Sequence, residues 1–330
     1  MKKILSLILS ALICALCLTS CSGGEAEKDG YKIAFVPKLT SVPWFERMED
    51  AVSDYNKENG TDYFYGGSTD TAGQVTYLEQ LLAEDWDAIC VVPYDTESIA
   101  PLLEKAKQDG IVVITHEADS LDPAYFDYDV EAFQSEALGT HYGEILVEKS
   151  GGEGAYIQFV GSLNSVTHNI WCDNADKYIA ENSNLKKLGR YETNDDTTSA
   201  YNQTKELLQA HPEIVAIEGS SSTDVSGIAR AVEELGLSGK VTIVGTSLPS
   251  VCGEYIESGT ITTISLWDPA LTAKVMFNLA EKVLDNRDAF STDGYTTDVE
   301  GYEKFTVQGN VLYGNARIDV TKDNIVEYNF

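Results

Sequence analysis

Basic side chains are scarce in this sequence, where 23 lysines and arginines stand against 53 aspartates and glutamates and the formal net charge is −30. Nucleic acids and anionic membrane surfaces attract proteins through clusters of lysine and arginine. The acidic excess therefore argues against both as partners, and no nucleic acid is expected to bind. It is typical instead of a protein whose charged surface keeps it in solution.

Cysteine is also rare, and half of the cysteines lie at the N-terminus. The six are Cys14, Cys17, Cys21, Cys90, Cys172 and Cys252. Three scattered cysteines in the body form no disulfide framework, and no CxxC or Cys/His spacing indicates zinc. Cys90 lies in the apolar segment 88–92, which predicts a core position. A Cys172–Cys252 bridge is left open by the sequence.

Motifs typical of enzymes are missing. The sequence contains no GxxxxGK[ST], no GxSxG and no HExxH, and it has only four histidines. We therefore expect no catalytic residues, no enzyme activity and no cofactor. His116 and His168, with Glu117 or Asp268, are a conceivable metal-ligand set. Because spacing alone does not bring them together, no metal site is predicted.

Long apolar runs are limited to one, Ile4 to Leu18, which follows Lys2 and Lys3. A basic start, an apolar stretch and small residues at the end are typical of an export signal. Leu18-Thr19-Ser20-Cys21 resembles a bacterial lipobox, in which the cysteine is lipidated. We predict a lipoprotein signal peptide over residues 1–20, lipidation of Cys21 and a flexible tether over 21–30.

This leader predicts an extracytoplasmic protein that is lipid-anchored to the cell membrane. An ordinary signal peptide with a chance cysteine, or a single transmembrane anchor, are the alternatives. The apolar run is short for a bilayer span.

The rest of the chain repeats one pattern, in which short apolar strands alternate with amphipathic helices. About three hundred residues are more than one core usually holds, so two lobes are expected. Continuous apolar strands spaced by helices predict parallel sheets covered on both faces. The first half ends with a strand at 111–115, and the second opens with a helix from about 130 to 149. The predicted fold class is α/β, with two doubly wound lobes.

Ligands of such sheets bind in the crevice at the carboxyl ends of the strands. The loops there carry aromatic, hydroxyl, carboxylate and basic groups that suit a hydroxylated ligand. The candidate ligand-binding residues are Lys38, Trp44, Phe45, Glu117, Asp119, Thr167, His168, Ser220, Ser222, Trp267 and Asp268. Each also has a purely structural interpretation, such as a helix cap for Asp268.

Several segments resemble one family. They are Ile33–Leu39 with Trp44-Phe45, Gly245–Ser250, Tyr255–Thr260, Leu266–Asp268 and Lys322–Phe330. Together they are similar to the type I periplasmic sugar-binding proteins, and most of all to the autoinducer-2 and rhamnose receptors. The similarity extends over nearly the whole mature chain.

This resemblance implies two lobes joined by a three-stranded hinge that close around a ligand, and docking on an ABC transporter permease. It implies an N-terminal lobe of residues 31–120 plus 267–300 and a C-terminal lobe of 121–266 plus 301–330.

By position, Lys38 matches the family's cleft lysine, and Trp44 and Phe45 match its aromatic pair. Glu117 replaces an aspartate, with Asp119 just beyond; Thr167-His168 replaces Asp-Gln, and Ser220–Ser222 replaces Pro-x-Ala. The altered hydrogen-bonding groups point to a small polyhydroxylated ligand as a class rather than to autoinducer-2 itself.

We therefore expect an extracytoplasmic solute-binding lipoprotein of an ABC importer that captures a small sugar or sugar-like ligand. The alternative is a sensor that presents its ligand to a membrane kinase or chemoreceptor. A hydrolase is disfavoured by the missing motifs. A cytoplasmic repressor is excluded by the export signal and by the lack of a DNA-binding helix pair.

Overall fold

A computed structural model describes residues 30–287 and 289–330. The predicted signal peptide, Cys21 and all but the last residue of the tether lie outside the described residues. Residues Lys32–Phe330 form one compact unit. Within the described part of the chain, no helix combines the length and the apolar character that a bilayer span requires.

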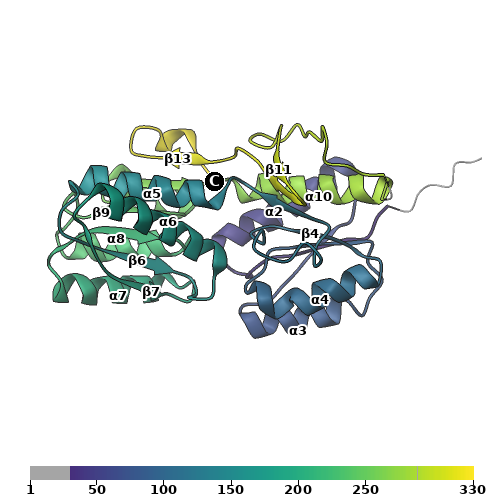
Figure 1. Cartoon of the computed structure of the whole chain (residues 1–330), viewed down its shortest axis with the longest axis horizontal. Helices are drawn as coiled ribbons and strands as arrows, with labels where there is room; N and C mark the ends of the chain where they lie inside the picture. Colours follow the sequence, from purple (N-terminus) through teal and green to yellow (C-terminus); the bar gives the residue numbers. More distant parts are fainter. Residues whose placement is uncertain (1–29, 288) are drawn as a thin grey trace, which may run out of the picture. The chain divides into compact units, whose positions relative to one another are not determined.

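The first of two sheets includes the strands labelled β4 and β11 in Figure 1, and its full strand order is β11-β12-β5-β4-β3-β1-β2. Its strands pair in parallel, apart from the antiparallel pair of β11 and β12. The strands are β1 (Ile33–Val36), β2 (Phe64–Tyr65), β3 (Ala88–Val91), β4 (Val112–Thr115), β5 (Tyr128–Glu131), β11 (Thr306–Gln308) and β12 (Val311–Tyr313). The helices packed on it are α2 (Pro43–Asn59), α3 (Thr71–Leu81), α4 (Thr96–Gln108) and α10 (Pro269–Asp285). We call this sheet with these helices the first lobe.

The second sheet has the order β13-β10-β9-β8-β6-β7. It is parallel except where β13 runs antiparallel to β10. Its strands are β6 (Ala155–Val160), β7 (Lys186–Glu192), β8 (Ile214–Gly219), β9 (Thr242–Gly245), β10 (Thr263–Leu266) and β13 (Ile318–Val320). Its helices are α5 (Ser135–Ser150), α6 (Val166–Asn182), α7 (Thr197–Ala210), α8 (Asp224–Glu234) and α9 (Pro249–Glu257), and a 3-10 turn, η1 (Ile325–Glu327), packs near α9. We call this part the second lobe. The two doubly wound lobes confirm the predicted fold class.

Strands β1, β3 and β4 are buried at every residue, which explains their continuous apolar sequences. Helix α10 follows the second sheet in sequence but packs on the first. The Phe277 ring of α10 lies 5.9 Å from Phe35 and 5.2 Å from Tyr55 between ring centroids. The Tyr55 hydroxyl also donates a 2.9 Å hydrogen bond to Asn278 Oδ1.

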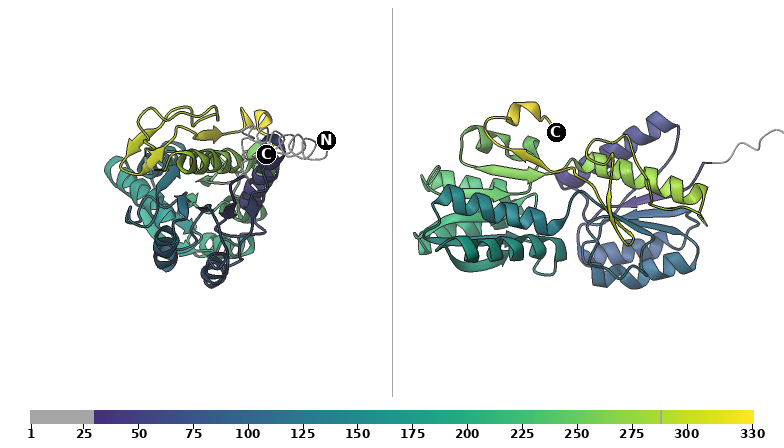
Figure 2. Two further views of the ribbon diagram at one scale, coloured as in Figure 1. Left: turned by 90° about the vertical axis from the view of Figure 1, so that its right-hand side faces the viewer. Right: turned by 45° about the horizontal axis from the view of Figure 1, so that its top comes forward.

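The chain crosses between the two sheets three times, after β5, after β10 and after β12. The right-hand view of Figure 2 shows the last crossing, where the C-terminal segment in yellow runs from one lobe to the other. Strands β5 and β12 pair with each other in the first sheet. By strand order, the chain leaves the first sheet after residues 131 and 313, whereas the predicted lobe boundaries are at 120/121 and 300/301.

The difference at the first boundary has a definite cause. Residues 128–131 form strand β5, whereas the sequence pattern predicted a helix from about 130; the helix α5 begins only at Ser135. Two of the four β5 residues, Asp129 and Glu131, are acids that are 0% and 4% exposed. Acidic residues in a short segment do not resemble a buried strand, so the hydrophobic pattern concealed it.

Helices α5 and α6 pack closely because glycine lies at their contact. A Cβ added to Gly139 of α5 would lie 2.3 Å from the carbonyl oxygen of Trp171 in α6, and one on Gly143 would lie 3.0 Å from that of Ala175. Backbone atoms cannot move aside as a flexible side chain does, so any larger residue at 139 must push the helices apart.

We expect Gly139→Ala to lower the free energy of unfolding by about 2 kcal/mol, because overpacking outweighs alanine's higher helix propensity. Gly253→Ala in α9 is the matched control, since its added Cβ would meet only Ile325 side-chain atoms at 3.8 Å. That control is expected to be neutral or stabilising by up to about 1 kcal/mol. Urea unfolding measures both, and equal effects of the two changes would contradict the close-contact explanation.

Buried carboxyl groups occur in both lobes. Burial raises the pKa of Glu218 at the end of β8 from 4.5 to about 7, and that of Asp224 at the start of α8 from 3.8 to about 7. In the first lobe, burial raises the pKa of Asp129 to about 7 although hydrogen bonds from Glu131 and Thr115 oppose it, and burial with repulsion by Asp129 raises the pKa of Glu131. Each of these groups therefore binds its proton more tightly in the folded protein than in the unfolded chain.

These groups make stability depend on pH in an unusual direction. Between about pH 4 and 7 the folded protein holds more protons than the unfolded chain, so their stabilisation is lost as pH rises through that range. Two buried histidines oppose this trend at the acidic end, because burial lowers the pKa of His116 to about 4 and of His168 to about 3.

We expect the melting temperature to rise as pH falls from 8 towards 5.5. The free energy of unfolding should change between pH 8 and pH 5.5 by about 2 kcal/mol less in Glu218→Gln than in the wild-type protein. The reason is that the variant lacks one carboxyl group whose pKa is raised by folding. Melting curves across this pH range measure the effect. Glu254→Gln on the exposed face of α9 is the control and should leave the slope unchanged. An unchanged slope in Glu218→Gln would contradict the assignment.

Candidate functional site

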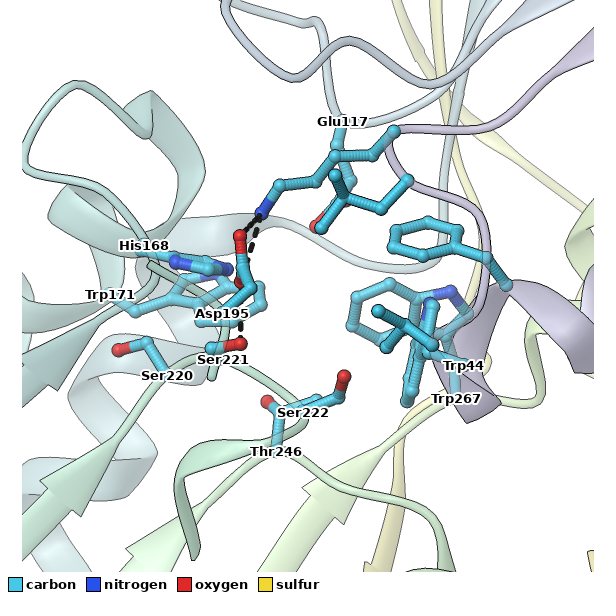
Figure 3. Close-up of a pocket in the computed structure, with 14 residues that line it drawn as sticks. Trp44, Glu117, His168, Trp171, Asp195, Ser220, Ser221, Ser222, Thr246 and Trp267 are labelled. Atoms are coloured by element: carbon cyan, nitrogen blue, oxygen red, sulfur yellow. Dashed lines mark hydrogen bonds and ion pairs between the residues drawn. The ribbon is translucent and has the colours of Figure 1, made fainter. Parts of the chain in front are cut away.

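A cavity lies where the carboxyl ends of the two sheets' strands meet (Figure 3). From the first lobe it is lined by the loop after β1, the start of α2 and the loop after β4. From the second lobe it is lined by the start of α6 and the loops after β7, β8 and β9, and Trp267 in the crossover after β10 completes the lining. The lining residues are Lys38, Leu39, Val42, Trp44, Phe45, Glu117, His168, Trp171, Asp195, Ser220, Ser221, Ser222, Thr246 and Trp267. The crevice expected from parallel strand order is therefore present.

Local sequence explains how these loops hold their shape. Pro43 begins helix α2 at a position where its missing N–H is not needed, so Trp44 and Phe45 start the helix at the cavity wall. Glu117 has φ +57° and Asp195 has φ +52°, the left-handed region that non-glycine residues rarely adopt. Such backbone costs about 1–3 kcal/mol per residue and is concentrated at functional sites.

One wall of the cavity is formed by indole rings. Trp44 and Trp267 meet edge to face with centroids 4.7 Å apart, and Trp171 lies 6.2 Å from Trp267. All three are at most 4% exposed. Rings held this way offer flat apolar faces of fixed orientation, against which the C–H face of a small ring molecule can pack.

The opposite side of the cavity is polar. Lys38 Nζ lies 3.3 Å from Asp195 Oδ1 and 3.1 Å from Oδ2, and the Ser221 hydroxyl donates a 2.6 Å hydrogen bond to Oδ1. Lys38 also lies over the Tyr94 ring, 5.3 Å from its centroid. Charged and hydroxyl groups thus converge from both lobes on one small volume.

Ionisation in the cavity follows from burial and from these partners. Burial lowers the pKa of Lys38, but attraction to Asp195 and Glu117 outweighs it and leaves the pKa above 10.5. Burial raises the pKa of Asp195, but Lys38, His168 and the Ser221 hydrogen bond leave it below 3.8. Burial raises the pKa of Glu117 to about 7, against the opposing effect of Lys38. The Lys38–Asp195 pair is therefore ionised.

His168 is neutral in this setting, since burial and then Lys38 lower its pKa to about 3. Its Nδ1 accepts a 3.1 Å hydrogen bond from the Gly161 N–H. The proton of the neutral ring is consequently assigned to Nε2, which makes His168 a donor through that atom.

The cavity brings together most of the predicted site residues. Lys38, Trp44, Phe45, Glu117, His168, Ser220, Ser222 and Trp267 line it. Thr167 lines a smaller adjoining cavity that Lys38, Glu117 and His168 share. Their contacts with a ligand stay a prediction.

Two predicted residues lie elsewhere. Asp119 accepts a 3.0 Å hydrogen bond from the Tyr313 hydroxyl. Asp268 caps helix α10 through a 2.9 Å hydrogen bond from the Ala270 N–H and pairs with Arg47 at 2.7 Å. Neither lines the cavity, because each carboxylate is held by its own neighbours; for Asp268 the capping role is the structural alternative that its sequence position suggested.

The predicted ligand-binding residues do not include six that line the cavity, namely Leu39, Val42, Trp171, Asp195, Ser221 and Thr246. Asp195 lies in the polar run Thr193-Asn194-Asp195-Asp196 directly after β7. The position of Asp195 after a strand could have indicated a place in the cleft. A run of turn-forming residues, however, has the same sequence pattern whether it faces solvent or a cleft.

The residues considered for metal and disulfide chemistry form neither a three-ligand metal group nor a disulfide among the described residues. His116 Nδ1 lies 2.6 Å from the Val130 carbonyl oxygen, in the core of the first lobe. Among residues 30–287 and 289–330, no three His, Cys, Asp or Glu side chains are grouped so that they can hold a metal ion. Cys90, Cys172 and Cys252 are buried, unbridged thiols.

Comparison with known proteins identifies relatives over about three quarters of the chain. The D-allose-binding periplasmic protein of Escherichia coli is 25% identical over 248 residues, 72% of this chain and 79% of that protein. A D-ribose/D-allose-binding protein of Pseudomonas aeruginosa is 26% identical over 272 residues, 74% of this chain and 81% of that protein.

Solved structures share the fold. LsrB from Clostridium saccharobutylicum in complex with AI-2 has a TM-score of 0.82 at 24% identity, covering 91% of this chain and 100% of that one. An ABC transporter solute-binding protein from Clostridium phytofermentas with bound L-rhamnose also has a TM-score of 0.82, at 20% identity and with 90% and 98% covered. At these identities the similarity establishes the fold.

The profile of the periplasmic binding protein domain matches residues 33–288, which is more than half of the chain. Periplasmic binding proteins are extracytoplasmic and bind solutes rather than transform them, which agrees with the expected location and with the expectation of a non-enzyme. By fold, by cavity and by this match, the chain belongs to the family of periplasmic binding proteins.

Proposed function

We propose that this protein captures a small sugar or sugar-like polyhydroxylated ligand outside the cytoplasm, as the solute-binding lipoprotein of an ABC importer. The observation that carries the proposal is the cavity between the lobes, which sets an indole wall against a group of hydroxyl, carboxylate and ammonium side chains. Such a pair of surfaces suits a molecule with an apolar C–H face and several hydroxyls.

The ligands of related proteins support the same class of ligand. The relatives named above bind D-allose or D-ribose, and the solved neighbours hold AI-2 or L-rhamnose. Those ligands are small and hydroxylated, in line with the chemistry of this cavity.

The proposed mechanism is closure of two rigid lobes about the three crossovers. In the closed cleft, Glu117 and Asp195 accept hydrogen bonds, while Lys38, His168 and the serine hydroxyls donate them. Water is excluded, so each polar contact is stronger than it is in an open site. Micromolar binding requires about 8 kcal/mol, which several such contacts and one packed face can supply.

We expect a thermal-shift screen of pentoses, hexoses, deoxyhexoses, polyols and AI-2 to find one class that raises the melting temperature, since such a ligand binds only the folded state. At pH 8, where the Glu117 carboxyl is ionised, Glu117→Gln should weaken binding of that sugar by tenfold or more, because a hydrogen bond to a charged group is worth about 1.5–3 kcal/mol. Calorimetric titration measures the affinities.

The exposed Glu213→Gln serves as a control and should leave the affinity unchanged. No response to any of these sugars or polyols would overturn the proposed ligand class.

Lipid anchoring is the second part of the proposal, and it rests on the Leu18-Thr19-Ser20-Cys21 segment. Acyl chains bind the bilayer by about 0.8 kcal/mol per buried CH₂. We expect the wild-type protein in the membrane fraction, with a lipid-modified Cys21 by mass spectrometry, and Cys21→Ser in the soluble fraction. A wild-type protein with an unmodified Cys21, or a Cys21→Ser protein that stays with the membrane, would contradict the anchor.

A further inference from the structure

We infer that Asp195 is a ligand-binding residue that also closes the cleft, by holding the Lys38 ammonium of the opposite lobe against the ligand. Asp195 lies after β7 of the second lobe, and Lys38 lies after β1 of the first. The inference rests on the proposed function, because it concerns the same cavity.

The first step is geometric. The Lys38 ammonium and the Asp195 carboxylate meet at 3.1–3.3 Å although 157 positions separate them in sequence. Their side chains are 7% and 6% exposed, so the contact is shielded from water. A contact between loops of opposite sheets exists only when the cleft is closed, so its energy belongs to the closed conformation.

The second step concerns the backbone that holds the carboxylate in place. Asn194 and Asp195 both adopt left-handed φ angles, +58° and +52°. A Cβ on Gly161 would lie 2.1 Å from Asp195 Oδ1, so only glycine leaves room for the carboxylate there. Two residues in an uncommon backbone conformation, and the absence of a side chain at Gly161, together position the Asp195 carboxylate. This indicates that the position of the carboxylate matters for more than the stability of the loop.

The third step is electrostatic. Each member of a buried ion pair loses hydration, and removal of one partner leaves an uncompensated charge in a poorly solvated site. Here the attraction exceeds the burial effect for both groups, as the direction of their pKa shifts shows. In an open cleft both charged groups are hydrated again. Removal of one partner therefore raises the free energy of the closed conformation relative to the open one.

The fourth step concerns hydrogen-bonding capacity. Asp195 Oδ1 accepts hydrogen bonds from the Ser221 hydroxyl and from Lys38 Nζ, whereas the buried Oδ2 has the 3.1 Å ion-pair contact with Lys38 Nζ and no further hydrogen bond from the described residues. A carboxylate oxygen can accept two hydrogen bonds. A ligand that enters the open cleft before closure can therefore use the second acceptor position of Oδ2, beside its contact with Lys38.

Closure can be measured without any ligand. Three of the four tryptophans, Trp44, Trp171 and Trp267, line the cavity and are shielded in the closed form. We expect acrylamide to quench the tryptophan fluorescence of Asp195→Asn more strongly than that of the wild-type protein. Lys38→Gln should show an increase of the same size, and the double variant should show no further increase, because all three lack the same pair.

Asp173→Asn is the matched control. It removes a carboxylate from the same lobe and breaks an ion pair with Arg190 at 2.7 Å, but the Asp173 side chain is 68% exposed and lies outside the cavity lining. Its quenching is expected to equal that of the wild-type protein. Circular dichroism verifies folding, and if Asp195→Asn does not fold, Lys38→Gln alone decides the closure role. Wild-type quenching in a folded Asp195→Asn, or in Lys38→Gln, would overturn the inference.

Ligand affinity separates this inference from the proposed function. With the sugar that stabilises the wild-type protein, we expect Asp195→Asn to bind at least tenfold more weakly, and the effects of Asp195→Asn and Lys38→Gln to be non-additive. If that sugar binds Asp195→Asn as tightly as the wild-type protein, the inference is wrong and the proposed function stands. If no sugar binds the wild-type protein, the proposed function is wrong, and the quenching experiment still decides whether Asp195 closes the cleft.

Discussion

Parallel strand pairing is the constraint on which the site depends. In each sheet it places the carboxyl ends of the buried strands along a single edge, so loops from distant parts of the chain become neighbours. The three crossovers then bring the two edges opposite each other. Lys38, Glu117, Asp195 and Ser221 share a cavity only because both conditions hold.

The closed cleft changes the chemistry of these side chains. His168 is neutral, Lys38 and Asp195 remain charged because they are paired, and Glu117 titrates near neutral pH. A dry site makes hydrogen bonds to such groups strong, but it also makes an unpaired group costly. The same arrangement therefore favours a ligand that satisfies every polar atom and disfavours one that leaves some unpaired.

Much of the candidate site could be predicted because it lies at strand ends that the apolar pattern reveals. Lys38 with Trp44 and Phe45 follows one such strand, and Glu117 follows another. Ligand contact by these residues stays a prediction, but their meeting at one cavity follows from the strand order. Asp195 was not predicted because the position of its carboxylate depends on the left-handed backbone of Asn194 and Asp195 and on the space left by Gly161. No local sequence pattern reveals these features.

The sequence by itself determined the local elements, since the alternation of apolar strands and amphipathic helices reflects which faces are buried. It also carries the features of the leader and the family resemblance. Only the tertiary structure decided that the acidic segment 128–131 is a buried strand and that Lys38 pairs with Asp195. The physical reason is the same in both cases. A buried ionisable group is either neutralised by gaining or losing a proton or stabilised by an oppositely charged partner far away in the chain. Neither can be recognised from the residues next to it in the sequence.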